Sequence, residues 1–180
     1  RANRYAEGMK KAMQNRDVIK ECLNEYRDEQ HKMKPEDVYW PVAVFCDKCS
    51  RDTTEITGYD GEWNVSYKCE CGNCETVDLR TFKGAKLGWR VDWPMRWNEE
   101  KVVFEPGGKD HISPGGSYDT AKLVSKKIYG WDAPITMRYD FVNLKGVPGK
   151  MSSSKGKVIA LPDALDVYQA EVLRYIFAST

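Results

Sequence analysis

The chain has 180 residues, 41% hydrophobic and 31% charged, a balance that suits one globular domain with a core and excludes a disordered chain. The formal net charge is only +1, so overall charge does not predict nucleic-acid binding, and any such contact must come from local patches. The longest apolar runs, VAVF and YIFA, are too short to cross a bilayer, and the opening RANRYAEGMK lacks the apolar stretch of a signal peptide. We therefore expect a cytoplasmic protein with no membrane partner, and the absence of an initial Met indicates part of a longer protein.

Residues 1–33 are predicted to be helical, because apolar side chains recur there with helical spacing. Two stripes carry this pattern: Tyr5, Met9 and Met13, then Ile19, Leu23 and Tyr26. Asn15 is a candidate N-cap between them, so we expect two helices or one kinked helix. Pro35 then ends the helical pattern.

Residues 41–79 are predicted to form short strands. PVAVF (41–45) is followed by TTEIT, WNVSYK and ETVDL, and β-branched and aromatic residues dominate these runs. YDGE, between the second and third runs, contains an Asp-Gly pair that is typical of a tight hairpin turn.

From residue 86 the expected elements alternate. The aromatic segment KLGWRVDWPMRW precedes a predicted strand KVVFE and a Gly/Pro-rich loop, PGGKDHISPGG (106–116). Ser117 is predicted to cap a helix that Gly130 closes at its C-terminal end. A strand ITMRYDFVNL, a second loop (146–157) and a helix DALDVYQAEVLRYIFA complete the chain. Leu165, Tyr168, Val172 and Ile176 are expected on one face of that last helix.

This strand, loop, helix, strand, loop, helix order predicts an α/β fold with a parallel sheet, as in half of a doubly wound nucleotide-binding domain. Ligands of such sheets lie beyond the carboxyl ends of the strands. Both Gly-rich loops follow predicted strands, so we expect them to face one crevice. The resulting division is a helical part (1–40), a cysteine-rich β subdomain (41–85) and the α/β part (86–180).

Five of the six cysteines lie between positions 46 and 74. Cys46 and Cys49 form one closely spaced pair, and Cys69, Cys71 and Cys74 follow after the predicted hairpin. Such spacing predicts a closed structural zinc site rather than disulfides, because nothing marks the chain as secreted. We expect Cys46, Cys49, Cys71 and Cys69 as ligands, with Cys74 as the alternative fourth ligand. The separate Cys22 is expected to be a packed thiol.

Four motifs, WRVDWPMRW, FEPGGKDH, GGSYDT and KMSSSKG, occur in that order and resemble the class I aminoacyl-tRNA synthetases, in particular the class I lysyl-tRNA synthetases. The resemblance covers nearly the whole chain, because that family also has a zinc-binding connective insertion ahead of these motifs. It implies a Rossmann-like catalytic domain, of which this chain would hold the second half, with an inserted zinc-ribbon-like β subdomain and N-terminal helices. It also implies that lysine is activated with ATP and Mg²⁺ to lysyl-adenylate, which is then passed to tRNA.

In this resemblance KMSSSKG stands at the family's KMSKS signature. Lys150 and Lys155 are the expected catalytic cations, since lysines are mobile point charges suited to the phosphates of an in-line displacement. Ser153 stands where many synthetases place their second lysine, so whether Lys155 takes over that role stays open. The residues expected to bind ATP are Gly108, Asp110, His111, Met151, Ser152, Ser153 and Ser154.

The lysine substrate is expected to contact Trp89, Asp92, His111 and Tyr139. Trp89 would form an apolar wall along the lysine stem, and Asp92 would pair with its ammonium. An equal alternative is that these tryptophans belong to the core and that Asp92 pairs with Arg90 or Arg96.

The 180 residues contain no HIGH string, the second signature of the class, so we expect the isolated chain not to aminoacylate tRNA. The sequence leaves two alternatives open. One is a non-catalytic zinc-ribbon module that binds nucleic acid or a protein. The other is a class I synthetase of different specificity, such as glutamyl.

Overall fold

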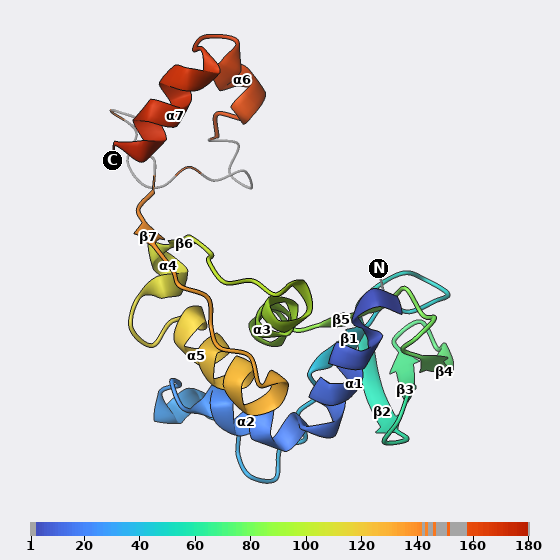
Figure 1. Ribbon diagram of the computed structural model, residues 1–180. Coiled ribbons are helices and arrows are strands. Elements are labelled where there is room, and N and C mark those ends of the chain that lie inside the picture. The colour runs from blue at the N-terminus through green and yellow to red at the C-terminus, as the bar shows by residue number, and fades with distance from the viewer. Residues whose placement is uncertain (1–2, 142, 144–145, 147–150, 152–157, 180) are drawn as a thin grey trace.

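The computed structural model describes residues 3–141, 143, 146, 151 and 158–179 (Figure 1). At the N-terminus a short 3-10 helix η1 (Asn3–Tyr5) leads into α1 (Ala6–Gln14) and α2 (Arg16–Asn24), and η2 (Glu29–His31) follows. Of the two forms predicted, two helices with a break at Asn15 is confirmed. The helical prediction up to residue 33 is too long, because α2 ends at Asn24 and Tyr26 of the second stripe lies beyond it. Asn15 does not cap α2 with its side chain, however, because its Nδ2 donates back to the Lys11 carbonyl (2.8 Å).

The cysteine-rich part forms two small antiparallel sheets, which confirms the predicted strands. β1 (Val42–Val44) pairs with β5 (Ala85–Leu87), and β2 (Thr54–Tyr59), β3 (Asn64–Cys69) and β4 (Cys74–Asp78) form a three-stranded meander. Gly61 lies in the predicted tight turn between β2 and β3 with φ +87°, a conformation that glycine adopts without steric cost.

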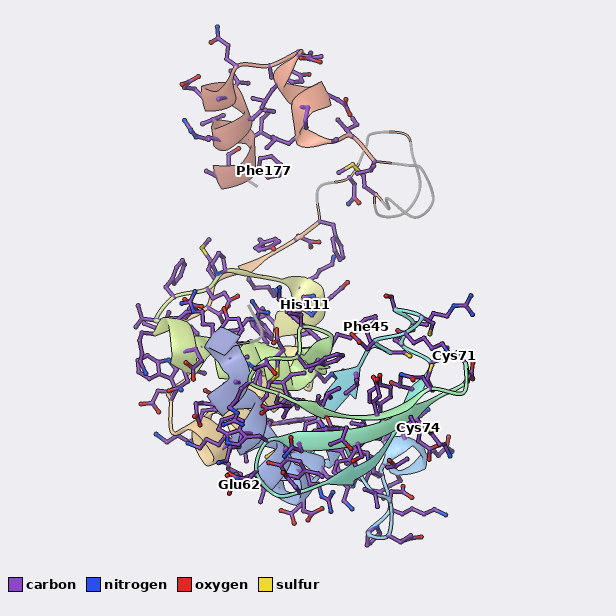
Figure 2. The ribbon with its side chains drawn as sticks, turned by 90° about the vertical axis from the view of Figure 1, so that its right-hand side faces the viewer. Phe45, Glu62, Cys71, Cys74, His111 and Phe177 are labelled. Atoms are coloured by element: carbon purple, nitrogen blue, oxygen red, sulfur yellow. The ribbon has the colours of Figure 1, made fainter. Side chains whose placement is uncertain are left out.

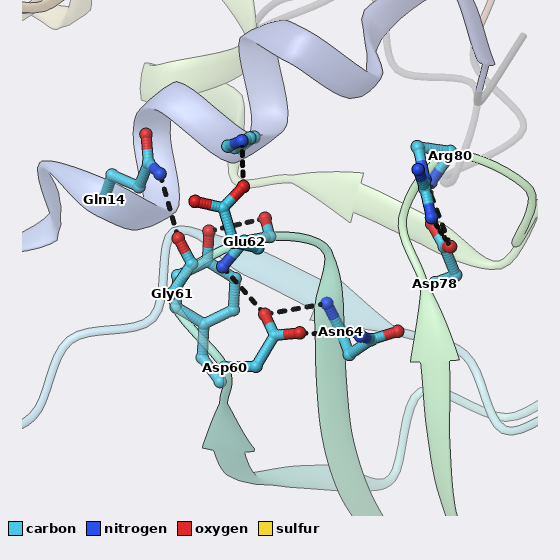
Figure 3. A network of polar contacts seen from close by, with 9 residues as sticks. Gln14, Asp60, Gly61, Glu62, Asn64, Asp78 and Arg80 are labelled. Atoms are coloured by element: carbon cyan, nitrogen blue, oxygen red, sulfur yellow. Dashed lines mark hydrogen bonds and ion pairs between the residues drawn. The ribbon is translucent and has the colours of Figure 1, made fainter.

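The β2–β3 turn is fixed to α1 by polar contacts (Figure 3). Gln14 Nε2 donates to the Gly61 carbonyl (2.8 Å), and Lys10 forms an ion pair with Glu62. Within the turn, the Asp60 carboxylate accepts the backbone N–H groups of Glu62 (2.7 Å) and Asn64 (3.0 Å). These contacts join the meander to the N-terminal helices.

The aromatic segment that sequence reasoning left unassigned is helix α3 (Trp89–Glu100). Trp89, Trp93 and Trp97 recur every fourth residue, which places their rings on one face of a helix. Pro94 lies inside α3, and this proline obscured the helical pattern in the sequence.

The α/β part contains a parallel strand pair, as predicted, but its first strand lies elsewhere. KVVFE (101–105) forms no strand, and β6 (Gly107–Gly108) and α4 (Lys109–Ile112) both lie in the segment predicted as a loop (106–116). The second strand, β7 (Arg138–Tyr139), is shorter than the predicted ITMRYDFVNL. β6 pairs in parallel with β7, and Phe104 and Ile135 form a further parallel bridge.

The connection between the two strands is mainly helical. It contains α4 (Lys109–Ile112), α5 (Ser117–Val124) and the π-helical turn η3 (Ser125–Tyr129). Gly130 ends this run with φ +71°, as expected, whereas Ser117 is the first residue of α5 and Gly116 is its N-cap.

The single helix predicted for residues 163–178 is wrong: the structure has two helices, α6 (Leu161–Leu165) and α7 (Ala170–Ala178). α6 and α7 contact each other and lie away from the other elements in Figure 1. The four residues expected on one face are therefore divided between α6, the connection and α7. Met151 lies beside α6 and α7, where it lines a hollow of about 570 Å³ together with Ile159, Leu161 and Tyr168.

The main buried cluster crosses all three predicted parts of the chain. It includes Met13 and Ile19 of the N-terminal helices, Val65 and Tyr67 of the meander and Val124 of α5. The domain boundaries stay a prediction, but these parts share one core. A second buried cluster joins Trp93 and Trp97 of α3 to Ala121 of α5. Among the described residues, no helix combines the length and apolar character that crossing a membrane requires.

Candidate functional site

Four cysteine sulfurs come together where the β1 end meets the β3–β4 turn. The Sγ atoms of Cys46, Cys49, Cys69 and Cys71 all lie within 4.8 Å of one another. The Cys46–Cys71 and Cys49–Cys69 sulfur pairs are each 3.7 Å apart. Four sulfurs bound tetrahedrally at about 2.3 Å from a zinc ion would lie roughly 3.8 Å from one another, so this group could hold such an ion.

The backbone around the two cysteine pairs has matching geometry. Each second cysteine is followed by a residue with positive φ, Ser50 at +58° and Gly72 at +87°. Each first cysteine accepts a backbone hydrogen bond at its carbonyl: Ser50 N–H donates to Cys46 O (2.8 Å), and Gly72 N–H donates to Cys69 O (2.9 Å). These two tight turns, called the first and second knuckle below, aim both pairs of sulfurs at one point.

The surroundings of the sulfurs shift their pKa values in opposite directions. Burial raises the pKa of Cys46, but the backbone N–H groups of Cys49 and Lys48 and the neighbouring thiols outweigh it and lower the pKa to about 6. The pKa of Cys69 is also lowered, first by the backbone N–H of Cys71. The backbone N–H of Asn73 lowers the pKa of Cys71. The Cys69 sulfur, burial and the remaining thiols outweigh this effect and raise the pKa to about 11. One sulfur of each knuckle is thus prepared to become a thiolate, the form that binds metals.

Cys74 lies outside this group, exposed at the start of β4, and Cys22 is buried in the main core, as expected for a packed thiol. Figure 2 shows Cys71 and Cys74 on the side of the meander, and His111 in a separate region of the molecule. Of the two candidates for the fourth sulfur, the structure therefore gathers Cys69 with the others and not Cys74.

A second group of predicted residues gathers beside the parallel strand pair. Trp89, at the start of α3, stacks on Trp93 with ring centroids 5.1 Å apart and an interplanar angle of 15°. The ring centroid of His111 lies 5.9 Å from Trp89 and 6.2 Å from Trp93. Trp89 remains 52% exposed, so its stacked ring presents an apolar face to solvent next to an imidazole.

The glycines of the first Gly-rich loop allow close packing at the same place. A Cβ at Gly107 would lie 2.6 Å from the Ile112 side chain, and one at Gly108 would lie 3.6 Å from the Tyr139 ring. Gly108 and Tyr139 are also register partners across β6 and β7. The strand pair therefore places Tyr139, which is exposed, beside the residue that precedes α4.

Asp92 lies elsewhere on α3. Its carboxylate forms an ion pair with Arg96 (2.6 Å), whose guanidinium also lies over the Tyr5 ring. This is the alternative that the sequence left open, and pairing of Asp92 with a substrate ammonium stays a prediction. Asp110 belongs to α4, one residue before His111.

The phosphate-loop residues Lys150, Ser152, Ser153, Ser154 and Lys155 lie outside the described residues. Of the predicted loop site, Met151 is described, and it lies against α6 and α7. Whether the two Gly-rich loops face one crevice likewise stays a prediction.

Sequence reasoning did not single out Glu105. Its carboxylate accepts hydrogen bonds from the indole N–H groups of both Trp93 (2.9 Å) and Trp97. The four-residue spacing of the tryptophans was the available signal, because two indoles on one helix face require nearby acceptors when they are buried.

Comparisons with known proteins agree with these motifs. A family model described as "tRNA synthetases class I (K)" matches residues 1–180. A lysine–tRNA ligase of Treponema pallidum is 59% identical over 98% of this chain and 33% of its own length. Those of Borreliella burgdorferi and Thermococcus kodakarensis are 51% and 46% identical, each over 99% of this chain and 33% and 34% of their own lengths. The chain thus spans about one third of the length of these relatives, and it belongs to the class I tRNA synthetase (K) family.

Proposed function

We propose that the chain is part of a class I lysine–tRNA ligase and contributes the lysine pocket, the signature loop and a zinc module to it. The observation that carries this proposal is the meeting of Trp89 and His111 beside the parallel pair β6–β7. Both residues come from motifs that resemble the lysyl class, and the curated relatives named above are lysine–tRNA ligases.

In the proposed reaction, a carboxylate oxygen of lysine attacks the α-phosphorus of ATP, and pyrophosphate leaves. The 3′-terminal ribose hydroxyl of the tRNA then attacks the carbonyl carbon of lysyl-adenylate, and AMP leaves. Trp89 is proposed to pack against the aliphatic stem of lysine. His111 and Tyr139 are proposed to supply hydrogen bonds at the same pocket, and Asp92 a charge for the ammonium once its pairing with Arg96 is exchanged.

ATP is proposed to bind along the first Gly-rich loop, where Gly108 allows close backbone approach and Asp110 and His111 offer polar contacts. Lys150 and Lys155 are proposed to neutralise the charge that builds up on the phosphates, with Ser152–Ser154 as donors to phosphate oxygens. Mg²⁺ accompanies ATP in this role. The parallel pair β6–β7, with α5 in its connection, supports the proposal of half of a doubly wound domain.

The four-sulfur group is proposed to bind Zn²⁺ through Cys46, Cys49, Cys69 and Cys71. Sulfur separations of 3.7 Å fit a tetrahedral zinc ion, and four protein ligands leave no open position for a catalytic water. Such an ion would stabilise the zinc-ribbon-like meander by joining the first knuckle to the second.

Pyrophosphate exchange into ATP by the full-length enzyme tests the activity. We expect exchange that depends on lysine, that glutamate does not support, and that yields lysyl-tRNA when tRNA is added. Lys150→Ala combined with Lys155→Ala should reduce the exchange rate by roughly a hundredfold or more, since each lysine stabilises transition-state charge. Exchange with glutamate in place of lysine would overturn the proposed specificity, and full activity of the double variant would overturn the role of the loop.

A further inference from the structure

The carboxylate of Glu105 is held between α3 and the parallel strand pair. One oxygen accepts the Trp93 indole N–H at 2.9 Å, and the other accepts the Trp97 indole N–H. An ionised carboxylate is an acceptor at both oxygens, so Glu105 matches two donors that no single amide oxygen or hydroxyl at this position could serve in the same way. Trp97 is 1% exposed and Trp93 is 7% exposed, so both indoles are nearly or fully buried.

The backbone of Glu105 is fixed as firmly as its side chain. Its N–H donates to Ile135 O (3.0 Å), and its carbonyl accepts the Thr136 hydroxyl (2.8 Å). Two residues later the chain enters β6 at Gly107, which pairs with Arg138. Glu105 is therefore anchored next to the strand pair, and through its carboxylate it sets the rotation of two side chains on α3.

Trp93 connects Glu105 to the exposed ring of Trp89. It is the ring on which Trp89 stacks, and its centroid also lies 6.2 Å from His111. Trp89 is half exposed, and Trp93 is the ring that stacks face to face with it, whereas the neighbouring His111 ring is tilted by 57°. A rotation of Trp93 would tilt or displace Trp89.

We propose that Glu105 is a positioning residue for the lysine pocket: by fixing the Trp93 indole, it holds the Trp89 ring at the angle at which the substrate stem packs. This inference rests on the proposed function, since it takes Trp89 as a wall of the lysine site. Glu105 touches no substrate in it and acts only through Trp93.

The two indoles make the inference testable with side chains of nearly the same size. Glu105→Gln leaves one acceptor oxygen, and its amide N–H₂ then faces the second indole N–H, which is a repulsive pairing of two donors. Trp97→Phe removes one donor, so in the double variant the amide oxygen introduced by Glu105→Gln can turn to Trp93 without that conflict. Trp93→Phe keeps an aromatic ring under Trp89 but removes the other donor, and with it the hydrogen bond that ties this ring to Glu105.

The experiment measures the KM for lysine and the KM for ATP in pyrophosphate exchange by the full-length enzyme, with thermal unfolding of each variant. Glu105→Gln and Trp93→Phe should each raise the KM for lysine by about tenfold, the effect of losing one charge-assisted hydrogen bond. The KM for ATP should stay within about twofold, because the proposed ATP contacts are shared among the two Gly-rich loops, and of these residues it is His111 that adjoins the Trp89–Trp93 stack. Trp97→Phe alone should leave the KM for lysine near that of the parent. Adding Trp97→Phe to Glu105→Gln should bring the raised KM for lysine most of the way back to the parent value.

A purely structural role for Glu105 predicts a different pattern. In that case Trp97→Phe and Trp93→Phe, which each remove one indole donor, would change stability and both KM values alike, and no rescue of the lysine KM would occur. That result, or an unchanged lysine KM in Glu105→Gln, would overturn the inference. If Trp89→Ala also leaves the lysine KM unchanged, the lysine pocket itself is wrongly placed; if Trp89→Ala raises it and Glu105→Gln does not, only the role of Glu105 fails.

Discussion

Ser50 and Gly72 occupy the same position in the two knuckles, directly after the second cysteine of each pair, and both have positive φ, +58° and +87°. Only one of the two is a glycine. A residue with a Cβ in the left-handed region costs roughly 1–2 kcal/mol relative to a right-handed conformation, so the first knuckle contains local strain that the second does not.

Ser50→Gly should therefore stabilise the chain. We expect a gain of about 0.5–1 kcal/mol in the free energy of unfolding, since the relief of strain exceeds the added entropy of the unfolded glycine. Gly72→Ala is the matched opposite change and should destabilise by about 1 kcal/mol, although nothing lies within 4 Å of its added Cβ. Denaturant unfolding with zinc present measures both. A loss of stability in Ser50→Gly would contradict this explanation.

Removing one of the four clustered sulfurs should release the metal, whereas removing the fifth sulfur should not. Cys69→Ser is expected to lower the zinc content of the purified chain well below one ion and to lower its unfolding temperature, because zinc binding contributes directly to folding. Cys74→Ser is the matched control and should keep both values. Loss of zinc from Cys74→Ser and retention in Cys69→Ser would show that the second knuckle binds through a different pair.

Gly116 supports the turn that carries His111. A Cβ there would lie 2.7 Å from the carbonyl oxygens of both His111 and Ser113, which are backbone atoms that cannot move aside easily. Gly116→Ala should cost about 1–3 kcal/mol of stability and shift the NMR resonances of His111. Gly58→Ala, whose Cβ would make an ordinary 3.8 Å contact with Ser66, is the control and should do neither. Equal effects of the two substitutions would rule out the steric argument.

The Asp60 carboxyl should titrate below its ordinary pKa of 3.8, mainly because the backbone N–H of Glu62 donates to the ionised form, with further donors from Asn64. Its contribution to stability is therefore complete above pH 3.8 and is lost as the pH falls through the lower, folded-state pKa. The titration midpoint of the Asp60 carboxyl carbon in NMR spectra measures this shift. Asn64→Ala removes one donor and should move the midpoint upward. A midpoint at or above 3.8 in the parent chain would disprove the role of the turn.

The parts of the fold that depend on local pattern could be predicted from the sequence. The strands of the meander, the turn at Gly61 and the gathering of cysteines follow from alternating β-type runs, an Asp-Gly pair and cysteine spacing. The parts of the fold that depend on contacts between residues distant in the sequence could not be predicted. α3 contains a proline and takes its stability from the buried side of its tryptophans, and the acceptor for those indoles, Glu105, lies beyond the helix in the segment that leads into β6.

Among the candidate site residues, sequence motifs indicated Trp89 and His111, and the structure brings their rings together. The same motifs could not say where the Asp92 carboxylate points, because two arginines on the same helix compete for it, and Arg96 lies one helical turn away. The break between α6 and α7 was also hidden, since the apolar spacing continues across it.

The central claim is that the stacked Trp89 ring forms a wall of a lysine pocket. The most direct measurement is the KM for lysine in pyrophosphate exchange by the full-length enzyme carrying Trp89→Ala, with Trp89→Phe as the variant that keeps a flat apolar ring. We predict a rise of roughly 10–100-fold for Trp89→Ala, a much smaller rise for Trp89→Phe, and an ATP KM within about twofold of the parent. A lysine KM that Trp89→Ala leaves unchanged would contradict the claim.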